Sequence, residues 1–325
     1  MVYKLRIAIL RGGPGNEYEV SMKSGSNILN NLSLDKYVIY DIPVSKEGIW
    51  YVNGFPTRPE KILGRIDLVF NTLSINGSHN RKIQKTLNDF GVVYVGSDAL
   101  SSGLSLNKAL SKNIYKIAGI KTPYFEVLKK ENYDKNSAKN LFKNIPIPCI
   151  VKPIDGGSSI GVNLACNLKE LARAIEIAME FSDSVLVEEF IEGREVVCGV
   201  LDNFREKEKY SLIPGEITFS DVVKYFNSEM KLAGSFEELS SKRLSQNEKK
   251  EIQKIAIDAH NILGLRHYSQ SDFIVSSKRG IYLLETNSLP SLDKNSVLLR
   301  ALEEIGVELP DFLDHLITLA YPHEL

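Results

Sequence analysis

Residues 4–31, KLRIAILRGGPGNEYEVSMKSGSNILNN, contain the unit that decides the fold of this chain. An apolar run from Lys4 to Leu10 ends at the glycine loop Arg11-Gly-Gly-Pro-Gly-Asn16, and a helix is predicted from about Ser21, its N-cap, to Asn31. The same order continues with strands predicted over 37–43, 67–73 and 92–95 and a helix over 82–90. Alternation of strands and helices predicts a parallel sheet covered by helices, so the expected fold class is α/β.

The composition is that of an ordinary globular protein. The 325 residues are 43% hydrophobic, and 40 basic against 41 acidic side chains leave a net charge of −1. This balance argues against nucleic acid or an anionic membrane as the partner, and no stretch approaches the roughly 18 apolar residues of a membrane helix. Cys149, Cys166 and Cys198 are widely spaced and indicate buried side chains in a reducing compartment. We therefore expect a cytoplasmic protein.

A glycine- and serine-rich loop follows the apolar run at 149–153. Asp155-Gly-Gly-Ser-Ser-Ile-Gly161 offers backbone N–H groups and hydroxyls to an anion, and Lys152 lies just upstream. The residues alone leave two interpretations, a cover over a phosphate group or a mobile hairpin tip. The earlier loop at 11–16 lacks the full spacing of a dinucleotide-binding or P-loop motif, so we interpret it as a tight turn between strand and helix.

A hairpin near the C-terminal end carries the clearest chemical pattern. Glu285 and Asn287 are two residues apart on a strand, so their oxygens face the same way. If the hairpin turns between Lys278 and Arg279, Asp272 lies directly opposite Glu285. Two carboxylates and an amide on one face repel unless a cation lies between them, and such hard oxygen ligands suit Mg²⁺. A solvated polar face, or salt bridges to distant lysines, would be the alternatives.

Several stretches match one known family in chain order. They are LRGGPGNEYEVSMKSG (10–25), LSLNKALSK (104–112), IVKPIDGGSSIGV (150–162), VLVEEFIEGREV (185–196), KY (224–225), YLLETNSLP (282–290) and Ser296. Together they resemble the D-alanine–D-alanine ligases of the ATP-grasp superfamily over nearly the whole chain. The resemblance implies an ATP-grasp fold of mixed α/β (α+β) type. Its expected domains are an N-terminal parallel α/β domain (1–100), a central lid domain (101–185) and a C-terminal domain with the metal site (186–325).

The resemblance also implies where ATP and metal bind. Lys108 and Lys152 would hold the phosphates, the loop with Ser158 and Ser159 would close over them, and Lys224 would reach the transferred phosphate. The adenine pocket would be lined by Glu188, Glu189, Phe190 and Ile191, and Glu195 would take the ribose hydroxyls. The cofactor would be two Mg²⁺ ions, with Mn²⁺ as an alternative, on Asp272, Glu285 and Asn287.

On the amino-acid side, the resemblance implies a triad of Glu17, Ser158 and Tyr225. The triad would hold the amino group of the first amino acid and close the long segment 215–245, which has few regular patterns, over the site. Gln270 would be a further catalytic residue, because its amide could still donate an N–H to the oxyanion, as could the backbone of Ser291. Glu17, Ser291 and Ser296 would contact the amino-acid substrates.

The departures from the family pattern cluster on this amino-acid side. Ser74-Ile75 and His79-Asn80-Arg81 stand where the family usually has His-Gly and Glu-Asp-Gly. Ser269-Gln-Ser-Asp272 replaces Gly-Arg-Ile-Asp, so Gln270 stands in place of the arginine that stabilises the oxyanion. Leu289-Pro-Ser291 replaces Ser-Pro-Gly, and Val222-Val-Lys-Tyr225 replaces Glu-Ala-Lys-Tyr. By analogy with the deletion of one oxyanion-hole donor, losing the guanidinium would cost about 10²–10³ in rate.

The expected function is therefore an ATP-dependent ligase that forms an acyl phosphate from a D-amino acid and joins it to a second amino acid, for peptidoglycan precursor synthesis. D-Alanine is the expected substrate. One alternative is a ligase of the same superfamily with a different amino-acid or hydroxy-acid acceptor. Another is a nucleotide-binding protein with weak or no ligation. Family members are often dimers, so a homodimer stays open, and no sequence feature decides it.

Overall fold

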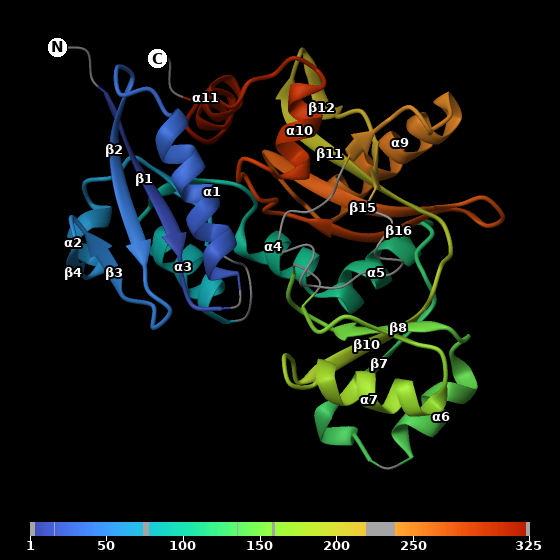
Figure 1. The fold of residues 1–325 in the computed structure, drawn as a ribbon. Coiled ribbons are helices and arrows are strands. Elements are labelled where there is room, and N and C mark those ends of the chain that lie inside the picture. Colours follow the sequence, from blue (N-terminus) through green and yellow to red (C-terminus); the bar gives the residue numbers. More distant parts are fainter. Residues whose placement is uncertain are drawn as a thin grey trace.

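The computed structural model describes residues 4–15, 17–73, 78–134, 136–157, 160–218 and 238–322. Three sheets, each with its own helices, form three lobes (Figure 1). The N-terminal sheet contains β1 (Leu5–Gly12), β2 (Tyr37–Val44), β3 (Trp50–Val52), β4 (Phe55–Thr57), β5 (Leu68–Asn71) and β6 (Val93–Val95), in the order β4-β3-β2-β1-β5-β6. Strands β2, β1, β5 and β6 pair in parallel, as the alternation predicts, and β3 and β4 add an antiparallel edge. The helices of this lobe are α1 (Tyr18–Asn31), α2 (Pro59–Leu63) and α3 (Ser78–Asp89).

Helix α1 begins earlier than the sequence predicts. Its N-cap is Glu17, so the prediction of Ser21 as N-cap is wrong. Ser21 lies inside the helix, and its hydroxyl accepts a hydrogen bond from the Gly12 amide at 2.8 Å. Gly12 has φ +88°, and a Cβ there would come within 2.5 Å of the Val44 carbonyl. The glycine therefore lets β1 turn beside β2, and the serine fixes the turn from the helix side.

The central lobe is an antiparallel sheet covered by helices on one face. Its strands are β7 (Phe125–Lys129), β8 (Cys149–Pro153), β9 (Asn163–Ala165) and β10 (Ser184–Glu189), in the order β7-β10-β8-β9. Its helices are the 3₁₀ turn η1 (Lys130–Asn132), α6 (Ser137–Asn144) and α7 (Leu168–Ala178). The segment 129–148 is polar and contains Pro146 and Pro148, which is typical of a surface connection, yet it contains α6. That helix contacts α7 and buries Ala138 and Leu141 in the core of this lobe, which supplies the stabilisation that its sequence lacks.

The C-terminal lobe is a second, larger antiparallel sheet. Its strands are β11 (Arg194–Phe204), β12 (Lys207–Ser211), β13 (Gly215–Thr218), β14 (Glu238–Ser240), β15 (Tyr268–Ser276) and β16 (Gly280–Asn287). They run in the order β14-β13-β11-β15-β16, with β12 paired to β11. The helices around it are α4 (Ala99–Leu106), α5 (Lys108–Ile117), α9 (Gln246–Ile262), α10 (Val297–Glu303) and α11 (Leu309–Ala320). Helices α4 and α5 contact β16, although all of α5 and most of α4 lie in the central segment 101–185. The proposed domain bounds stay a prediction.

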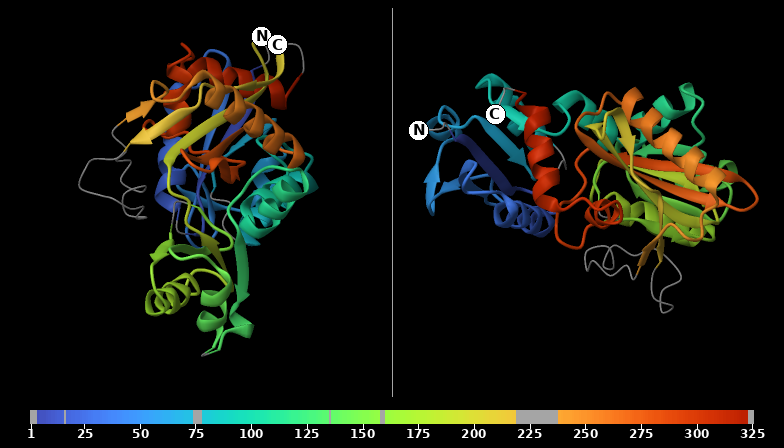
Figure 2. Two further views of the ribbon diagram at one scale, coloured as in Figure 1. Left: turned by 90° about the vertical axis from the view of Figure 1, so that its right-hand side faces the viewer. Right: turned by 90° about the horizontal axis from the view of Figure 1, so that it is seen from above.

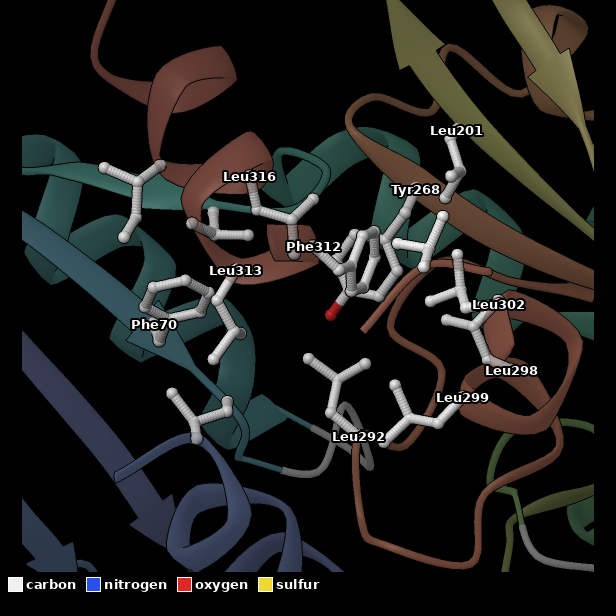
Figure 3. Close-up of a cluster of buried hydrophobic side chains, with 14 of the residues drawn as sticks. Phe70, Leu201, Tyr268, Leu292, Leu298, Leu299, Leu302, Phe312, Leu313 and Leu316 are labelled. Carbon is white, nitrogen blue, oxygen red and sulfur yellow. The ribbon is translucent and has the colours of Figure 1, made fainter. Parts of the chain in front are cut away.

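Helix α11 joins the first lobe to the last. Phe312, Leu313 and Leu316 are fully buried among residues of both sheets, including Phe70 of β5 and Tyr268 of β15 (Figure 3). The rings of Tyr268 and Phe312 meet edge to face at 5.9 Å. Each such buried side chain contributes about 1.5–3 kcal/mol. Figure 2 shows the red helix α11 beside the blue N-terminal lobe, where it contacts α1 and β6, so the two lobes share one core.

Two expectations from composition meet the structure here. Cys149 and Cys198 are buried, but Cys166 is exposed, so the expectation of three buried cysteines is wrong for Cys166. Burial raises the pKa of Cys149 to about 11, which keeps its thiol protonated. Within the described ranges, no helix combines the length and the apolar character needed to cross a bilayer.

Candidate nucleotide and metal site

The acidic pair lies on one face of the β15–β16 hairpin. Asp272 is the direct partner of Glu285 across the two strands, and Gln270 is the partner of Asn287. Residues two apart on a strand share a face, so all four polar groups face the same way. The Gln270 amide donates to Asp272 Oδ1 at 3.2 Å, which agrees with this placement. The predicted opposition of Asp272 and Glu285 is confirmed.

The route to that opposition differs from the prediction. The hairpin turns through three residues, Ser277 to Arg279, and not between Lys278 and Arg279, so Ser276 pairs with Gly280. That change alone would place Asp272 opposite Leu284. A register shift between Asp272 and Phe273 corrects it, because Phe273 pairs with Leu283 and Leu284 is the extra residue. The prediction placed the turn one residue off and omitted the extra residue Leu284, and these two errors cancel. The β-bulge at Leu284 brings the two carboxylates opposite each other.

A lysine connects this face to the glycine-rich loop. Lys108 is the first residue of α5, whose N-cap Asn107 accepts a hydrogen bond from the Leu110 amide at 3.0 Å. The Lys108 Nζ donates to the Gly156 carbonyl and lies 4.0 Å from Glu285 Oε2. Burial lowers the pKa of Lys108, and the Glu285 charge opposes that effect. One ammonium group therefore lies between the loop and the acidic pair.

A second carboxylate, Glu188 of β10, is held by two lysines. Lys152 of β8 approaches its Oε1 at 2.6 Å, and Lys112 of α5 approaches its Oε2 at 3.0 Å. All three side chains are buried. Burial by itself would raise the pKa of Glu188, but the two lysines outweigh it and the pKa is lowered. Glu188 is therefore ionised, and the cluster keeps a positive charge.

Sequence reasoning missed Lys112. It lies within the matched stretch 104–112, four residues after Lys108. Side chains at i and i+4 share a helix face, so this spacing was the available clue.

The predicted adenine-pocket residues lie at the end of β10 and just beyond it. The Glu189 carboxylate accepts the Tyr124 amide at 3.0 Å and pairs with Arg279 at 2.9 Å, so it ties β10 to the hairpin tip. The Phe190 amide donates to the Pro148 carbonyl at 3.1 Å. Ile191 and Glu195 are buried. Their contacts with a nucleotide stay a prediction.

On the amino-acid side, the structure brings Glu17 to the glycine-rich loop. A Cβ built on Gly157 would lie 2.7 Å from Glu17 Oε1, so the carboxylate touches the loop next to Ser158 in the chain. Ser158, Ser159, Lys224 and Tyr225 lie outside the described residues, as do Ser74, Ile75 and Val222. The triad of Glu17, Ser158 and Tyr225 therefore stays a prediction.

The loop after β16 holds the remaining two predicted residues. The Ser291 hydroxyl bonds to Ser24 of α1 at 2.9 Å and to Asp293 at 2.6 Å. Ser296 is the N-cap of α10 and accepts the Leu299 amide at 3.4 Å. Both serines thus hold the loop in place, and their contact with substrate stays a prediction.

These three lobes, with lysines beside a glycine-rich loop and opposed carboxylates on a hairpin, define the class of ATP-grasp ligases. A sequence profile described as "D-ala D-ala ligase C-terminus" matches residues 114–318, which is more than half of the chain. The chain belongs to the D-alanine–D-alanine ligase family.

Relatives and solved structures agree with that assignment. The D-alanine–D-alanine ligase of Thermoanaerobacter sp. (strain X514) is 33% identical, over 98% of this chain and 96% of the relative. The structure of D-alanyl-alanine synthetase A from Vibrio cholerae superposes with a TM-score of 0.85 at 26% identity, covering 99% of each chain. The VanG D-Ala:D-Ser ligase from Enterococcus faecalis superposes with a TM-score of 0.81 at 27% identity, covering 98% of this chain and 100% of that one.

Proposed function

We propose that this protein is an ATP-dependent D-alanine–D-alanine ligase that releases ADP and phosphate. One observation carries the proposal for this chain. Lys108 contacts the carbonyl of Gly156 in the glycine-rich loop and lies 4.0 Å from Glu285, which faces Asp272. A triphosphate beneath the loop would thus meet a lysine on one side and oxygen ligands for a metal on the other.

The donor set on the hairpin fits magnesium. One face of the hairpin carries Asp272, Glu285 and Asn287. Their two ionised carboxylates and one amide oxygen are the ligands that a hard cation prefers. The Asn287 Oδ1 already accepts the Leu289 amide at 2.9 Å, and this bond fixes the side chain. We propose that these residues hold two Mg²⁺ ions, or Mn²⁺ in their place. When bound, the ions would neutralise phosphate charge and orient the phosphate oxygens.

The first step activates a carboxylate. A carboxylate is a poor acyl donor, because its leaving group would be oxide. An oxygen of the first D-alanine forms a bond to the γ-phosphorus of ATP, the bond to the β–γ bridging oxygen breaks, and ADP leaves. Lys108 and Lys152 would stabilise the charge on the phosphate oxygens during this transfer.

The second step forms the peptide bond. The amine of the second D-alanine attacks the acyl carbon, phosphate leaves, and the amine loses a proton. An amide nitrogen carries two hydrogens, and Gln270 uses one of them toward Asp272. The other would serve the developing oxyanion. Contact between Glu17 and the loop at Gly157 would help to exclude water, which otherwise hydrolyses the acyl phosphate.

A second candidate is a ligase that accepts a different amino or hydroxy acid. Its specific support is Gln270, which offers a neutral amide tied to Asp272 where the family pattern has a guanidinium. Ser291 also supports this candidate, because it stands in the loop beside the site where the family pattern has glycine. Its hydroxyl is hydrogen-bonded to Ser24 of α1.

The test is turnover with a panel of substrates. Phosphate release is measured with ATP, Mg²⁺ and D-alanine alone, then with D-serine, D-lactate and L-amino acids added, and the products are identified by mass spectrometry. We expect D-alanine alone to stimulate release and to yield the dipeptide. A mixed product in preference to the dipeptide would support the second candidate. Nucleotide binding without any stimulated release would contradict both.

The proposed reaction also implies a setting. Its dipeptide would enter peptidoglycan precursors, and its ATP requirement supports a cytoplasmic location. A homodimer is the proposed assembly, and light scattering coupled to size exclusion measures it directly.

A further inference from the structure

Lys108 and Lys152 are the lysines of this region that are expected to contact phosphate. The cluster around Glu188 contains a further lysine, Lys112, that has no expected role. Lys112 is completely buried, whereas Lys152 and Lys108 reach the edge of the cluster with a small exposed fraction. Besides Glu188, Lys112 donates to the Thr122 hydroxyl at 2.8 Å. Its ammonium group is therefore held from two directions inside the protein.

Charge balance indicates what Lys112 does. Lys152 is bound to Glu188 at 2.6 Å, so a phosphate oxygen that approaches its ammonium group competes with Glu188 for the same positive charge. Removing one partner of a buried ion pair leaves an uncompensated charge, which is strongly destabilising. Lys112 stays on the other oxygen of the same carboxylate. With Lys112 present, Glu188 keeps a counter-ion in both states, and the cost of the exchange is small.

We propose that Lys112 is a positioning residue for the nucleotide phosphates: it serves as the permanent counter-ion of Glu188, so that Lys152 can exchange Glu188 for a phosphate oxygen. The inference rests on the proposed use of ATP, and it assigns no contact between Lys112 and the nucleotide. Without Lys112, Glu188 would retain Lys152, and the site would lose a phosphate-binding cation although that lysine is still present.

The experiment separates phosphate binding from adenosine binding. Dissociation constants for ADP and for adenosine are measured in Mg²⁺ by calorimetry. The ratio of the adenosine constant to the ADP constant reports what the phosphates contribute, and changes in the adenine pocket cancel in it. Lys112→Met is expected to lower this ratio about 10–100-fold, the scale of one charge-assisted contact. Adenosine affinity is expected to change less than about threefold.

Two controls exclude a packing effect. Lys116→Met makes the same change one turn later on α5 at an exposed position, and Thr122→Val removes the other partner of Lys112 but leaves its charge. Both should keep the ratio within about threefold of the wild type, since a counter-ion remains on Glu188. If Thr122→Val lowered the ratio as much as Lys112→Met, the role of Lys112 would be packing and the proposal would be wrong.

The carboxylate supplies the decisive variant. Glu188→Gln removes the charge that retains Lys152, so it should keep or raise the ratio, alone and when combined with Lys112→Met. This single variant tests the proposal even if Lys112→Met fails to fold. A ratio that falls in Glu188→Gln, or that stays unchanged in folded Lys112→Met, overturns it. Wild-type protein that binds ADP no better than adenosine would overturn both this inference and the proposed function. Normal nucleotide binding without D-alanine-dependent turnover would contradict only the proposed function.

Discussion

The nucleotide side and the amino-acid side of the site are built differently. The nucleotide side consists of strands and a helix start, and its charges are buried and paired, as at Glu188 with Lys112 and Lys152. The amino-acid side combines the loop after β16 with one position of β15, and its described groups are mostly hydroxyls and amides, such as Ser291 of the loop and Gln270 of the strand. Phosphate chemistry needs fixed charges, which a sheet register can hold, whereas substrate choice depends on neutral polar groups that can change without unfolding the protein. The departures from the family pattern cluster on this amino-acid side, in loops and at Gln270 of β15.

The largest expected effect belongs to the acidic pair. Asp272→Asn should lower Mg²⁺-dependent turnover by about 10³-fold, because it removes a charged metal ligand. The fold should persist, since the change also relieves the repulsion between Asp272 and its cross-strand partner Glu285. Turnover is followed over a Mg²⁺ titration, with thermal unfolding as the control. Unchanged turnover would remove the basis for the metal site.

The contact between Glu17 and the loop tests the amino-acid side. In Gly157→Ala, the new methyl would lie 2.7 Å from Glu17 Oε1, so the loop or Glu17 must move. We expect kcat/KM for D-alanine to fall about 10–100-fold, because a displacement of about 1 Å near the reacting groups costs this much. Gly103→Ala is the matched control, since nothing lies within 4 Å of its added Cβ in helix α4. Equal losses in both variants would show that the Glu17 contact is irrelevant.

Gln270→Arg tests the amino-acid side by restoring the arginine of the family pattern. A guanidinium there should raise kcat by up to about 10-fold while KM for ATP stays the same, because the change adds a charged donor for the oxyanion. Steady-state kinetics with each substrate varied in turn separates the two constants. A lower kcat would mean that the pocket has been rebuilt around the amide, which favours the acceptor other than D-alanine.

The smallest effect at neutral pH concerns the hydrogen bond between His267 and Gly96, which lies outside both sides of the site. His267 Nδ1 accepts the Gly96 amide at 3.0 Å, which links the N-terminal sheet to the strand that carries Gln270 and Asp272. Burial, with a smaller contribution from Arg266, lowers the pKa of His267 to about 4. Between pH 4 and the ordinary value of about 6.5, the unfolded chain binds more protons. The stabilisation is therefore present above pH 6.5 and is lost as the pH falls toward 4, by up to about 3 kcal/mol.

Denaturant unfolding at several pH values measures this loss. His267→Asn keeps a residue that tolerates the positive φ of +69° at this position. It should flatten the decrease in stability between pH 6.5 and pH 4. The Asp202 pKa is also lowered, but its contribution disappears only below pH 3.8, outside that window. An unchanged slope in His267→Asn would assign the acid sensitivity to other groups.

The sequence predicted most of the elements but not every contact among them. Helix α6 was missed, because its residues are mostly polar and its stability comes from burying Ala138 and Leu141 in the core that it shares with α7. Lys112 was missed, because its partner Glu188 is distant in the chain and only folding brings them together. The opposition of Asp272 and Glu285 was predicted with the wrong turn, since no periodic pattern reveals a bulge at Leu284.

By itself, the sequence determined the order of strands and helices, the kinds of groups available and the family, because hydrophobic periodicity and short motifs are local properties of the chain. The tertiary structure decided which of these groups meet. A bulge places Asp272 opposite Glu285, α5 brings Lys112 to Glu188, and α11 packs against the N-terminal lobe. Such contacts depend on how distant surfaces fit together, and that fit is absent from any single stretch of sequence.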